Sequence, residues 1–532
     1  MALLRRHAAL LLVLAAAAFL RFYALSNLPP ANYRDVALTG TDALRAAAGH
    51  PRLHFTYDEG LYADLIGLVF ALLGASDWTL RAPGALFGVL TCWGVFGLGR
   101  SFGRERAGLL GAGLLAVSFW HVLLSRSGFR AILLPCLLVH ATIFLVEGLR
   151  GRGTWRLLLG GGLFGLGVHV YPAVRFAPLL LPAYFITEAR SSGQGWRVPF
   201  RRFGVFAAAA FVVAMPMLLH YLHHPEHFTF PRRVLSIFSP KVERRDVPAY
   251  LVRNLEATLL MFHVRGDGNR RHNLSGAPML DPLTGLLFLA GIFFVVRPRP
   301  AGTAVAELAD RGAPRPTPRP GGDEGRDAPL AALLLGWLIA MLLPNILSVE
   351  GVPHGLRTCG VLPAVALLGG IGFEAAYLFL GRVAGVRLAA AATVTALILV
   401  GCLNGYRYFV VWAQDPQVAH DHDAAYRQAA HVLLSAAAGT ELLLVANGSG
   451  LPAYGHPVEA EVYLFEMRDR PPTILGPHDA DRLVLSGRPT LVAFIEKDDR
   501  IIEILRRFNP GARIVEIQAQ GTPLESPVYR VN

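Results

Sequence analysis

Carboxylate side chains gather in one short stretch of this sequence, residues 32–62, which separates a first apolar segment from the rest of a strongly apolar chain. Asp35 stands near its start in a Tyr-Arg-Asp sequence, and Asp58 and Glu59 form an acidic pair near its end. Carboxylates beside segments that must lie in lipid are costly unless they line water or a site. At a site they could take the proton of an attacking hydroxyl, and elsewhere they favour the first turn of a helix. The candidates for catalysis are Asp35, Asp58 and Glu59, and the neighbouring candidates for substrate contact are Tyr33 and Tyr62.

Arginine side chains stand at the ends of several apolar segments. Arg126 and Arg130 belong to the sequence Ser-Arg-Ser-Gly-Phe-Arg, a very short turn between two such segments. A planar guanidinium group suits the oxygen atoms of a phosphate at a lipid surface, and it also anchors helices at the membrane interface. The candidate phosphate-binding residues are Arg126, Arg130, Arg175 and Arg357.

The segment 263–285 is dense in side chains that bind sugars or phosphates, and Gly266 and Gly268 predict a tight turn within it. Its histidines do not have the spacing of a zinc site on a helix, so a metal there would need a distant carboxylate such as Glu59. A divalent metal therefore remains an open possibility, and no other cofactor is indicated. The candidate substrate-binding residues are Asp267, Asn269, His272 and Asn273 of this segment, and His354 of a later loop.

The composition is that of a membrane protein. Of the 532 residues, 53% are hydrophobic and only 17% are charged, which is below the quarter typical of soluble domains. The net charge of +12 could suggest nucleic acid, but the arginines stand in short pieces between apolar blocks, as topology signals do. We therefore expect no nucleic-acid partner. Lysine occurs only at positions 241 and 497 against abundant arginine, which suggests the coding bias of a GC-rich prokaryote.

Long apolar blocks predict about eleven membrane spans. The first follows Arg5 and Arg6, and the others lie at 81–98, 108–124, 131–148, 155–170, 174–187, 203–222, 279–296, 328–347, 358–379 and 388–412. Alternate loops are rich in arginine, and such loops stay in the cytoplasm. This predicts a cytoplasmic N-terminus, outer loops at 26–80 and 223–278, and a cytoplasmic linker at 298–327.

Beyond the last predicted span the pattern changes. Helical patterns at 422–435, 459–467 and 500–508 alternate with strand patterns at 441–445, 490–495, 513–518 and 528–531. Alternation of this kind predicts a small α/β domain. We therefore divide the chain into a membrane domain, residues 1–412, and an extracytoplasmic domain, residues 413–532.

Several stretches together resemble glycosyltransferase family 39 and its relatives, GT-C type membrane enzymes that include protein O-mannosyltransferases and lipid A aminoarabinose transferases. The resemblance rests on the order and spacing of Tyr33–Leu44, Trp78–Leu90, Ser118–Leu133, Gly266–Gly285 and Pro353–Pro363.

The same resemblance assigns roles to acids of the first outer loop. It matches Asp35 to the first-loop aspartate taken as the catalytic base, and Glu59 to the second acidic position of that loop. Val36 stands where relatives often have another acid, and Asp58-Glu59-Gly60 stands where many have Glu-Pro. The base is thus either Asp35 or a member of the Asp58/Glu59 pair.

The resemblance implies a mostly α, GT-C-like bundle that transfers a hexose or pentose from a polyprenyl-phosphate-linked donor, with inversion, to a hydroxyl of a lipid, glycan or protein. Such an enzyme would act at the outer face of a prokaryotic cytoplasmic membrane. One alternative is a transporter or flippase of lipid-linked sugars, which would place its polar groups at the middle of the membrane. Another is a membrane-anchored binding module in which the C-terminal domain is the working part.

Overall fold

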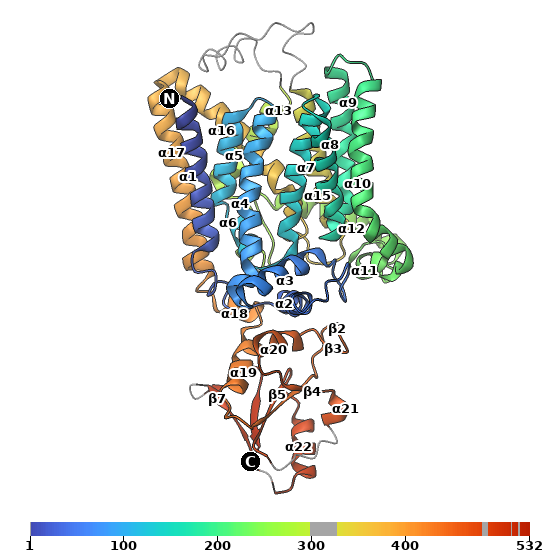
Figure 1. Cartoon of the computed structure of the whole chain (residues 1–532). Helices are drawn as coiled ribbons and strands as arrows, with labels where there is room; N and C mark the ends of the chain where they lie inside the picture. The colour runs from blue at the N-terminus through green and yellow to red at the C-terminus, as the bar shows by residue number, and fades with distance from the viewer. Residues whose placement is uncertain (1, 298–326, 481–487, 512, 520–521, 532) are drawn as a thin grey trace.

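A computed structural model of the chain describes residues 2–297, 327–480, 488–511, 513–519 and 522–531. A bundle of helices makes up most of it, and a smaller region with a β-sheet lies at one end of the bundle (Figure 1). The N-terminal helix begins at the opposite end. The predicted linker lies outside the described residues, apart from its last residue, Asp327.

The first half of the bundle and the loop at its lower end are built from the following elements: α1 (Ala2–Phe22), α2 (Arg34–Ala47), α3 (Leu61–Leu73), α4 (Asp77–Ser101), α5 (Glu105–Val117), α6 (Phe119–Arg126), η1 (Arg130–Ile132), α7 (Leu133–Leu149), α8 (Thr154–Leu166), η2 (Gly167–His169), η3 (Pro172–Leu180), α9 (Leu181–Ser191) and α10 (Arg197–His223). The second half consists of α11 (Pro225–Leu235), η4 (Arg244–Asp246), α12 (Val247–Leu260), α13 (Pro282–Val295), α15 (Ala328–Ile346), η6 (Cys359–Val361), α16 (Leu362–Ala384), α17 (Val386–Tyr406) and η7 (Arg407–Trp412).

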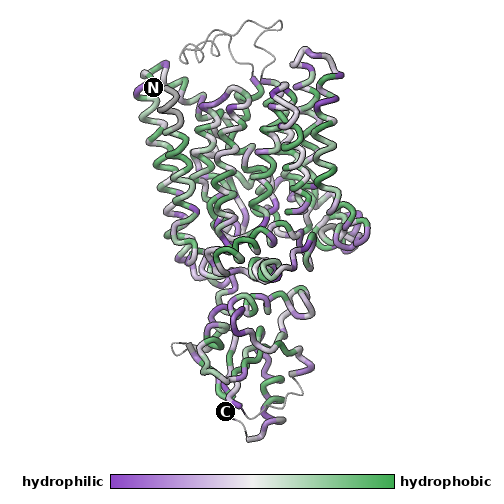
Figure 2. Tube along the Cα trace, viewed as in Figure 1, coloured by the Kyte–Doolittle hydropathy of each residue, from purple (hydrophilic) through white to green (hydrophobic). Residues whose placement is uncertain are grey.

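Apolar residues cover the length of the bundle and polar residues gather at its two ends (Figure 2). Among the described residues, six helices are long and apolar enough to cross a membrane, or seven if the bent pair α5 and α6 forms one span. The predicted total of about eleven is not confirmed. Proline breaks the stretch from η3 to α9 at positions 172, 178 and 182. The apolar part of α1, Ala8–Phe22, and the helices α8 and α13 are too short to qualify, although α8 packs between α7 and α10.

The C-terminal region carries a five-stranded sheet with helices against it. Its elements are α18 (Pro416–Asp421), α19 (Ala424–Leu434), β1 (Glu441–Val445), β2 (Pro452–Ala453), β3 (His456–Pro457), α20 (Ala460–Glu466), β4 (Thr473–Leu475), α21 (Pro477–Ala480), β5 (Thr490–Phe494), α22 (Asp499–Phe508), β6 (Ile514–Glu516), β7 (Gln518–Ala519), β8 (Thr522–Pro523) and β9 (Val528–Val531). The strand order is β4-β1-β5-β9-β6. β1 runs parallel to β4 and β5, and β9 runs antiparallel to β5 and β6. The predicted helices and strands of this region are present, together with the unpredicted elements α18, α21, β2, β3, β4 and β8. The boundary at residue 412 stays a prediction.

The first loop folds into two helices, α2 and α3, that lie across the end of the bundle, between it and the sheet region (Figure 1). α2 faces the bundle on one side and α20 on the other, and its Gly40 lets the two helices meet closely. A Cβ atom at Gly40 would lie 2.6 Å from the ring of Phe465. Polar bonds reinforce this contact, because Thr41 donates to Glu461 (2.5 Å) and Tyr454 donates to Asp42 (2.6 Å).

Arg81, near the start of α4, fixes the path of the chain into this loop. Its side chain is fully buried and donates hydrogen bonds to the carbonyl oxygens of Leu25, Pro29 and Ala31 and to the side-chain oxygen of Asn32, at 2.7–3.1 Å. Backbone carbonyls without partners are costly away from water, so one arginine here satisfies groups that no regular element can.

We expect Arg81→Met to lower the free energy of unfolding by about 3 kcal/mol, because it leaves four buried acceptors unsatisfied. The measurement is thermal or denaturant unfolding of the detergent-solubilised protein. Arg100→Met, on the same helix but exposed, should change stability by less than about 0.5 kcal/mol. Equal unfolding curves for the two variants would contradict this assignment.

Candidate active site

A cluster of opposite charges lies where the first loop meets the bundle. Arg130, at the start of η1, forms an ion pair with Asp58 and lies 3.7 Å from the carboxylate of Glu59. Arg175 of η3 approaches the other oxygen of Glu59 at 4.0 Å. The structure thus brings together two predicted catalytic acids and two of the predicted phosphate-binding arginines.

A tight turn over residues 53–60 presents the two acids. The backbone amide of Phe55 donates to the carbonyl of Asp58 (2.9 Å), and that of Gly60 donates to the carbonyl of Leu53 (2.8 Å). Gly60 is required here because a Cβ atom would lie 1.7 Å from the carbonyl oxygen of Arg52. The Asp58-Glu59-Gly60 sequence therefore reflects the geometry of this turn.

Glu59 is buried at the centre of the cluster. Tyr221, at the end of α10, donates a hydrogen bond to its Oε1 (2.9 Å), while Oε2 has no hydrogen-bond partner among the described residues. Burial raises the pKa of Glu59, and the positive charge of Arg130 opposes that rise. One carboxylate oxygen and two guanidinium groups are thus left with capacity to contact a polar ligand.

Asp35 lies in the first turn of α2, and its side chain remains exposed although dense protein surrounds it. That surrounding burial, with the nearby carboxylate of Asp58, raises the pKa of Asp35 to about 6. Arg271, Arg130 and Arg34 lie near enough to oppose the rise. A carboxyl group with a pKa close to neutral is well suited to accept and release a proton.

A cavity of about 700 Å³ opens between α2, the 263–285 loop and the C-terminal region. Its lining mixes aromatic faces with charges of both signs: Tyr33, Arg34, Asn269, Arg271, His420, Asp421, Asp423, Ala425, Tyr426, Ile495, Glu496, Lys497 and Glu525. Arg34 holds the two sides together through ion pairs with Asp423 (2.6 Å) and Glu459 (2.5 Å). Arg271 lies over the ring of Tyr33, 3.7 Å from its centroid, and so links the cavity to Asp35. The predicted substrate contacts Tyr33 and Asn269 both line this space.

Arg357 lies near Tyr171, as Arg130 and Glu59 also do. The positive charges of Arg357 and Arg130 both act on Tyr171, and the guanidinium carbon of Arg130 lies 5.6 Å from the centre of its ring. Arg357 itself donates to the carbonyl of Glu350 (2.6 Å). Arg130, Arg175 and Arg357 thus form a basic set around Tyr171 and Glu59.

Two predicted residues lie outside this site. Arg126 is fully buried and donates to Tyr408 and to the carbonyls of Leu20, Arg21 and Leu28, so its guanidinium group serves the packing of the bundle. Tyr62 is fully buried in an apolar cluster. Their positions do not support the predicted contacts with phosphate or substrate.

The remaining predicted residues build the 263–285 loop itself. Asp267 is buried and accepts hydrogen bonds from His272 (3.1 Å) and from the backbone amide of Gly355 (2.7 Å). Asn273 donates to the carbonyls of Asp267 and Ala277, and the ring of His354 lies 4.5 Å from that of His272. Burial lowers the pKa of both histidines. None of these four side chains lines the cavity.

Sequence reasoning missed several residues of the site. Arg271 lies in the segment 263–285, but the sequence does not distinguish it from Arg270 as a residue of the site. Tyr171 and Tyr221 come from separate parts of the chain, and Asp423 and Glu459 come from the C-terminal region. Only the folded arrangement brings these five residues to the first loop.

ArnT from Cupriavidus metallidurans bound to undecaprenyl phosphate superimposes with a TM-score of 0.56 at 15% identity, covering 98% of this chain and 97% of that one. This chain has the fold of the GT-C type membrane glycosyltransferases.

Two further GT-C structures agree. Arabinofuranosyltransferase AftD from Mycobacteria has a TM-score of 0.52 at 15% identity, covering 98% of this chain and 39% of that one. AglB from Archaeoglobus fulgidus, in complex with an inhibitory peptide and a dolichol-phosphate, has a TM-score of 0.50 at 12% identity, covering 89% and 64%. The family model for dolichyl-phosphate-mannose-protein mannosyltransferase matches residues 61–220. A comparison with curated protein sequences found no match. The expected GT-C fold is thereby confirmed.

We expect Arg130→Met to lower the free energy of unfolding by about 3 kcal/mol, because it leaves the buried Glu59 carboxylate without its main counter-charge. Adding Glu59→Gln to Arg130→Met should restore part of that loss, and unfolding of the four proteins of this double-mutant cycle measures the coupling. Arg152→Met removes an exposed ion pair with Glu147 and should cost less than about 1 kcal/mol. If the effects of Arg130→Met and Glu59→Gln on the free energy of unfolding were additive, a direct interaction between Arg130 and Glu59 would be contradicted.

Proposed function

We propose that this protein transfers a sugar from a polyprenyl-phosphate-linked donor to a hydroxyl of a polar acceptor at the outer face of the membrane. The observation that carries this proposal is the placement of Asp35, with its pKa near neutral, beside the Arg130 cluster at one end of a GT-C bundle. The isoprenoid phosphates bound to ArnT and AglB support a lipid phosphate as the leaving group.

The arginines would bind the donor phosphate. Sugar transfer breaks the bond between the anomeric carbon and a phosphate oxygen, so negative charge grows on that oxygen as it leaves. Arg130 and Arg175, with Arg357 near Tyr171, are fixed before the reaction and cost little reorganisation while they stabilise that charge. Glu59 would hold Arg130 and Arg175 in place, and with Asp58 it would keep the net charge of the cluster close to zero before the donor binds.

Asp35 would be the general base. The acceptor hydroxyl attacks the anomeric carbon, its oxygen forms the new glycosidic bond, and its proton passes to the Asp35 carboxylate. A base on the face opposite the leaving phosphate gives inversion. Asp58 is engaged by Arg130, and Glu59 is buried between two arginines, so Asp35 is the better base of the three acids.

The acceptor would enter through the cavity between α2 and the C-terminal region. Tyr33 and Tyr426 offer aromatic faces. Arg271 and Lys497 offer positively charged hydrogen-bond donors, and Glu496 offers a negatively charged acceptor. Such a mixture fits the alternating apolar faces and hydroxyl edges of a sugar-like acceptor. This arrangement gives the C-terminal region a part in acceptor binding.

A divalent metal is not required in this proposal. The phosphate charge is met by fixed guanidinium groups, and Asp58 and Glu59 are already paired with arginine.

Asp35→Asn should lower kcat about a hundredfold to ten-thousandfold, because the amide cannot accept the acceptor proton. The measurement is transfer of radiolabel from a panel of polyprenyl-phosphate sugars by the reconstituted protein, with extracted membrane glycans and lipids as acceptors. Asp64→Asn, in the first turn of α3 and away from the cluster, is the matched control and should transfer at the wild-type rate. Wild-type transfer by Asp35→Asn would remove the base assignment. Movement of the labelled lipid across the bilayer without any transfer would favour a flippase.

The pH profile should identify the same carboxylate. Asp35 must be ionised to act as a base, so kcat/KM should fall as the pH drops through about 6. The negative charge of Asp58 raises the pKa of Asp35, so Asp58→Asn should move this acidic limb to lower pH. Asp64→Asn should leave it in place. If Asp58→Asn retained measurable activity and the acidic limb of its kcat/KM profile stayed at the wild-type pH, the assignment of Asp35 as the base would be contradicted.

A further inference from the structure

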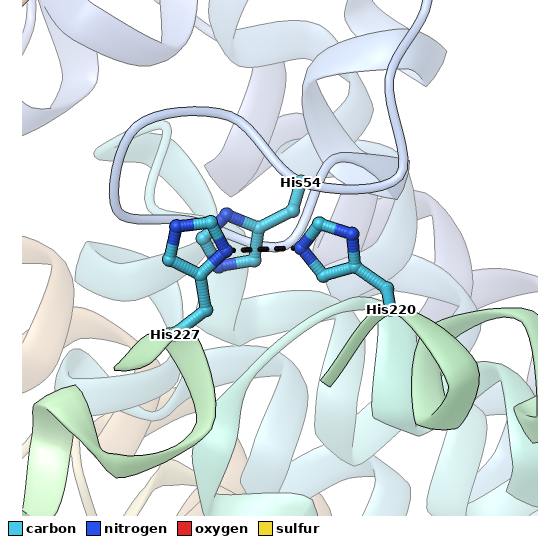
Figure 3. Close-up of side chains that lie close together, drawn as sticks. All are labelled: His54, His220 and His227. Carbon is cyan, nitrogen blue, oxygen red and sulfur yellow. Dashed lines mark hydrogen bonds between the residues drawn. The ribbon is translucent and has the colours of Figure 1, made fainter. Parts of the chain in front are cut away.

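Three histidines from separate parts of the chain converge beside the first loop (Figure 3). His54 stands in the turn before Glu59, His220 in the last turn of α10, and His227 in α11. One ring nitrogen of each lies within 4.8 Å of the corresponding atoms of the other two. His220 Nε2 and His227 Nδ1 are 3.0 Å apart. This group shares no residue with the acids and arginines of the proposed active site.

The three rings stack on one another. The rings of His54 and His227 are parallel within 2°, with centroids 4.3 Å apart, and those of His54 and His220 are 5.3 Å apart. All three residues are half-buried. The Nδ1 atom of His54 is buried and has no hydrogen-bond partner among the described residues. A buried ring nitrogen without a partner costs stability, so its presence calls for an explanation.

Neutral imidazole is the form that binds metals. The three ring nitrogens that converge here, together with the unpartnered Nδ1 atom of His54, can therefore act as ligands for a metal ion.

We propose that His54, His220 and His227 bind a divalent transition-metal ion of the zinc class. Imidazole ligands favour zinc, cobalt, nickel or copper over magnesium and calcium, which prefer oxygen. Metal–nitrogen bonds of about 2.0–2.1 Å put tetrahedral ligand atoms about 3.3 Å apart. The pair His220–His227 is already close to this separation, and rotation of the His54 ring would complete the set. The fourth position would hold water.

The bound ion would tie the 53–60 turn to the ends of α10 and α11. The backbones of His54 and Glu59 pair as an antiparallel bridge, and Tyr221, which follows His220, donates to Glu59. The ring of Tyr57 also stacks on Phe230 of α11, with centroids 5.3 Å apart. A clamp at this point would hold Glu59 against Arg175. Only this positioning role rests on the proposed function, because metal binding is tested by itself.

A second possible group overlaps the first. His224, Glu226 and His227 also place one ligand atom each within 4.8 Å of one another, but His224 and Glu226 are exposed and already in contact at 3.3 Å. The two groups share His227 alone. Variants in the residues that they do not share therefore separate them.

The test is metal binding to the full-length, tag-free protein in detergent after treatment with a chelator. Co²⁺ is titrated and followed by its visible absorption, Zn²⁺ is used to displace it, and bound metal is counted by elemental analysis. We expect one Co²⁺ per chain, displaced by Zn²⁺, and a rise in melting temperature on Zn²⁺ binding. His54→Ala and His220→Ala should each weaken Zn²⁺ binding by at least about 100-fold.

His50→Ala, an exposed histidine of the same loop, should bind Zn²⁺ as the wild type does. Unchanged melting of the metal-free His54→Ala protein shows that any loss of binding is not a loss of folding. Absence of Co²⁺ binding by the wild type would overturn the proposal. So would loss of binding in His224→Ala and Glu226→Gln while His54→Ala binds normally, because the ion would then sit in the exposed group. Failure of sugar transfer with intact Zn²⁺ binding would count against the proposed function and leave the metal site standing.

Discussion

The ion pairs of Arg130 with Asp58 and Glu59 are the interaction on which this end of the molecule depends. Carboxylates held against an apolar bundle are strongly destabilising unless a counter-charge lies within reach. Arg130 supplies that charge from the connection between α6 and α7, and its ion pairs hold the 53–60 turn against the bundle. A cation placed to neutralise protein carboxylates is also placed to receive a phosphate, so the same residue serves folding and the proposed binding of the donor.

The C-terminal region completes the site from the other side. Arg34, next to Asp35 in α2, pairs with Asp423 and Glu459 of that region, and Gly40 lets α2 meet α20 closely. The position of Asp35 is therefore set by two bodies that pack on opposite faces of one short helix. The cavity beside it exists only because both are present. This dependence gives the C-terminal region a structural role even before any acceptor is considered.

Much of this could be read from the sequence, and the exceptions have physical causes. The spacing of apolar residues and the composition predicted a mostly helical bundle and the α/β elements beyond residue 412. This was possible because such spacing depends only on residues close together in the sequence. The predicted number of about eleven spans is not confirmed, since hydropathy does not show where proline breaks a helix, as at 172, 178 and 182. Arg126 and Arg130 are four positions apart and look alike in sequence. Their roles differ because backbone carbonyls surround the guanidinium group of Arg126, whereas carboxylates surround that of Arg130. Only the tertiary structure determines these surroundings.

The central claim is that arginines bind the donor phosphate while Asp35 acts on the acceptor. Equilibrium binding of undecaprenyl phosphate to the purified protein, followed by native mass spectrometry, tests this division directly. The account predicts that Arg175→Met weakens binding by at least about tenfold, as expected for loss of a charge-assisted bond. It also predicts that Asp35→Asn binds the lipid as tightly as the wild type or more tightly. Wild-type binding by Arg175→Met, or loss of binding in Asp35→Asn, would contradict it.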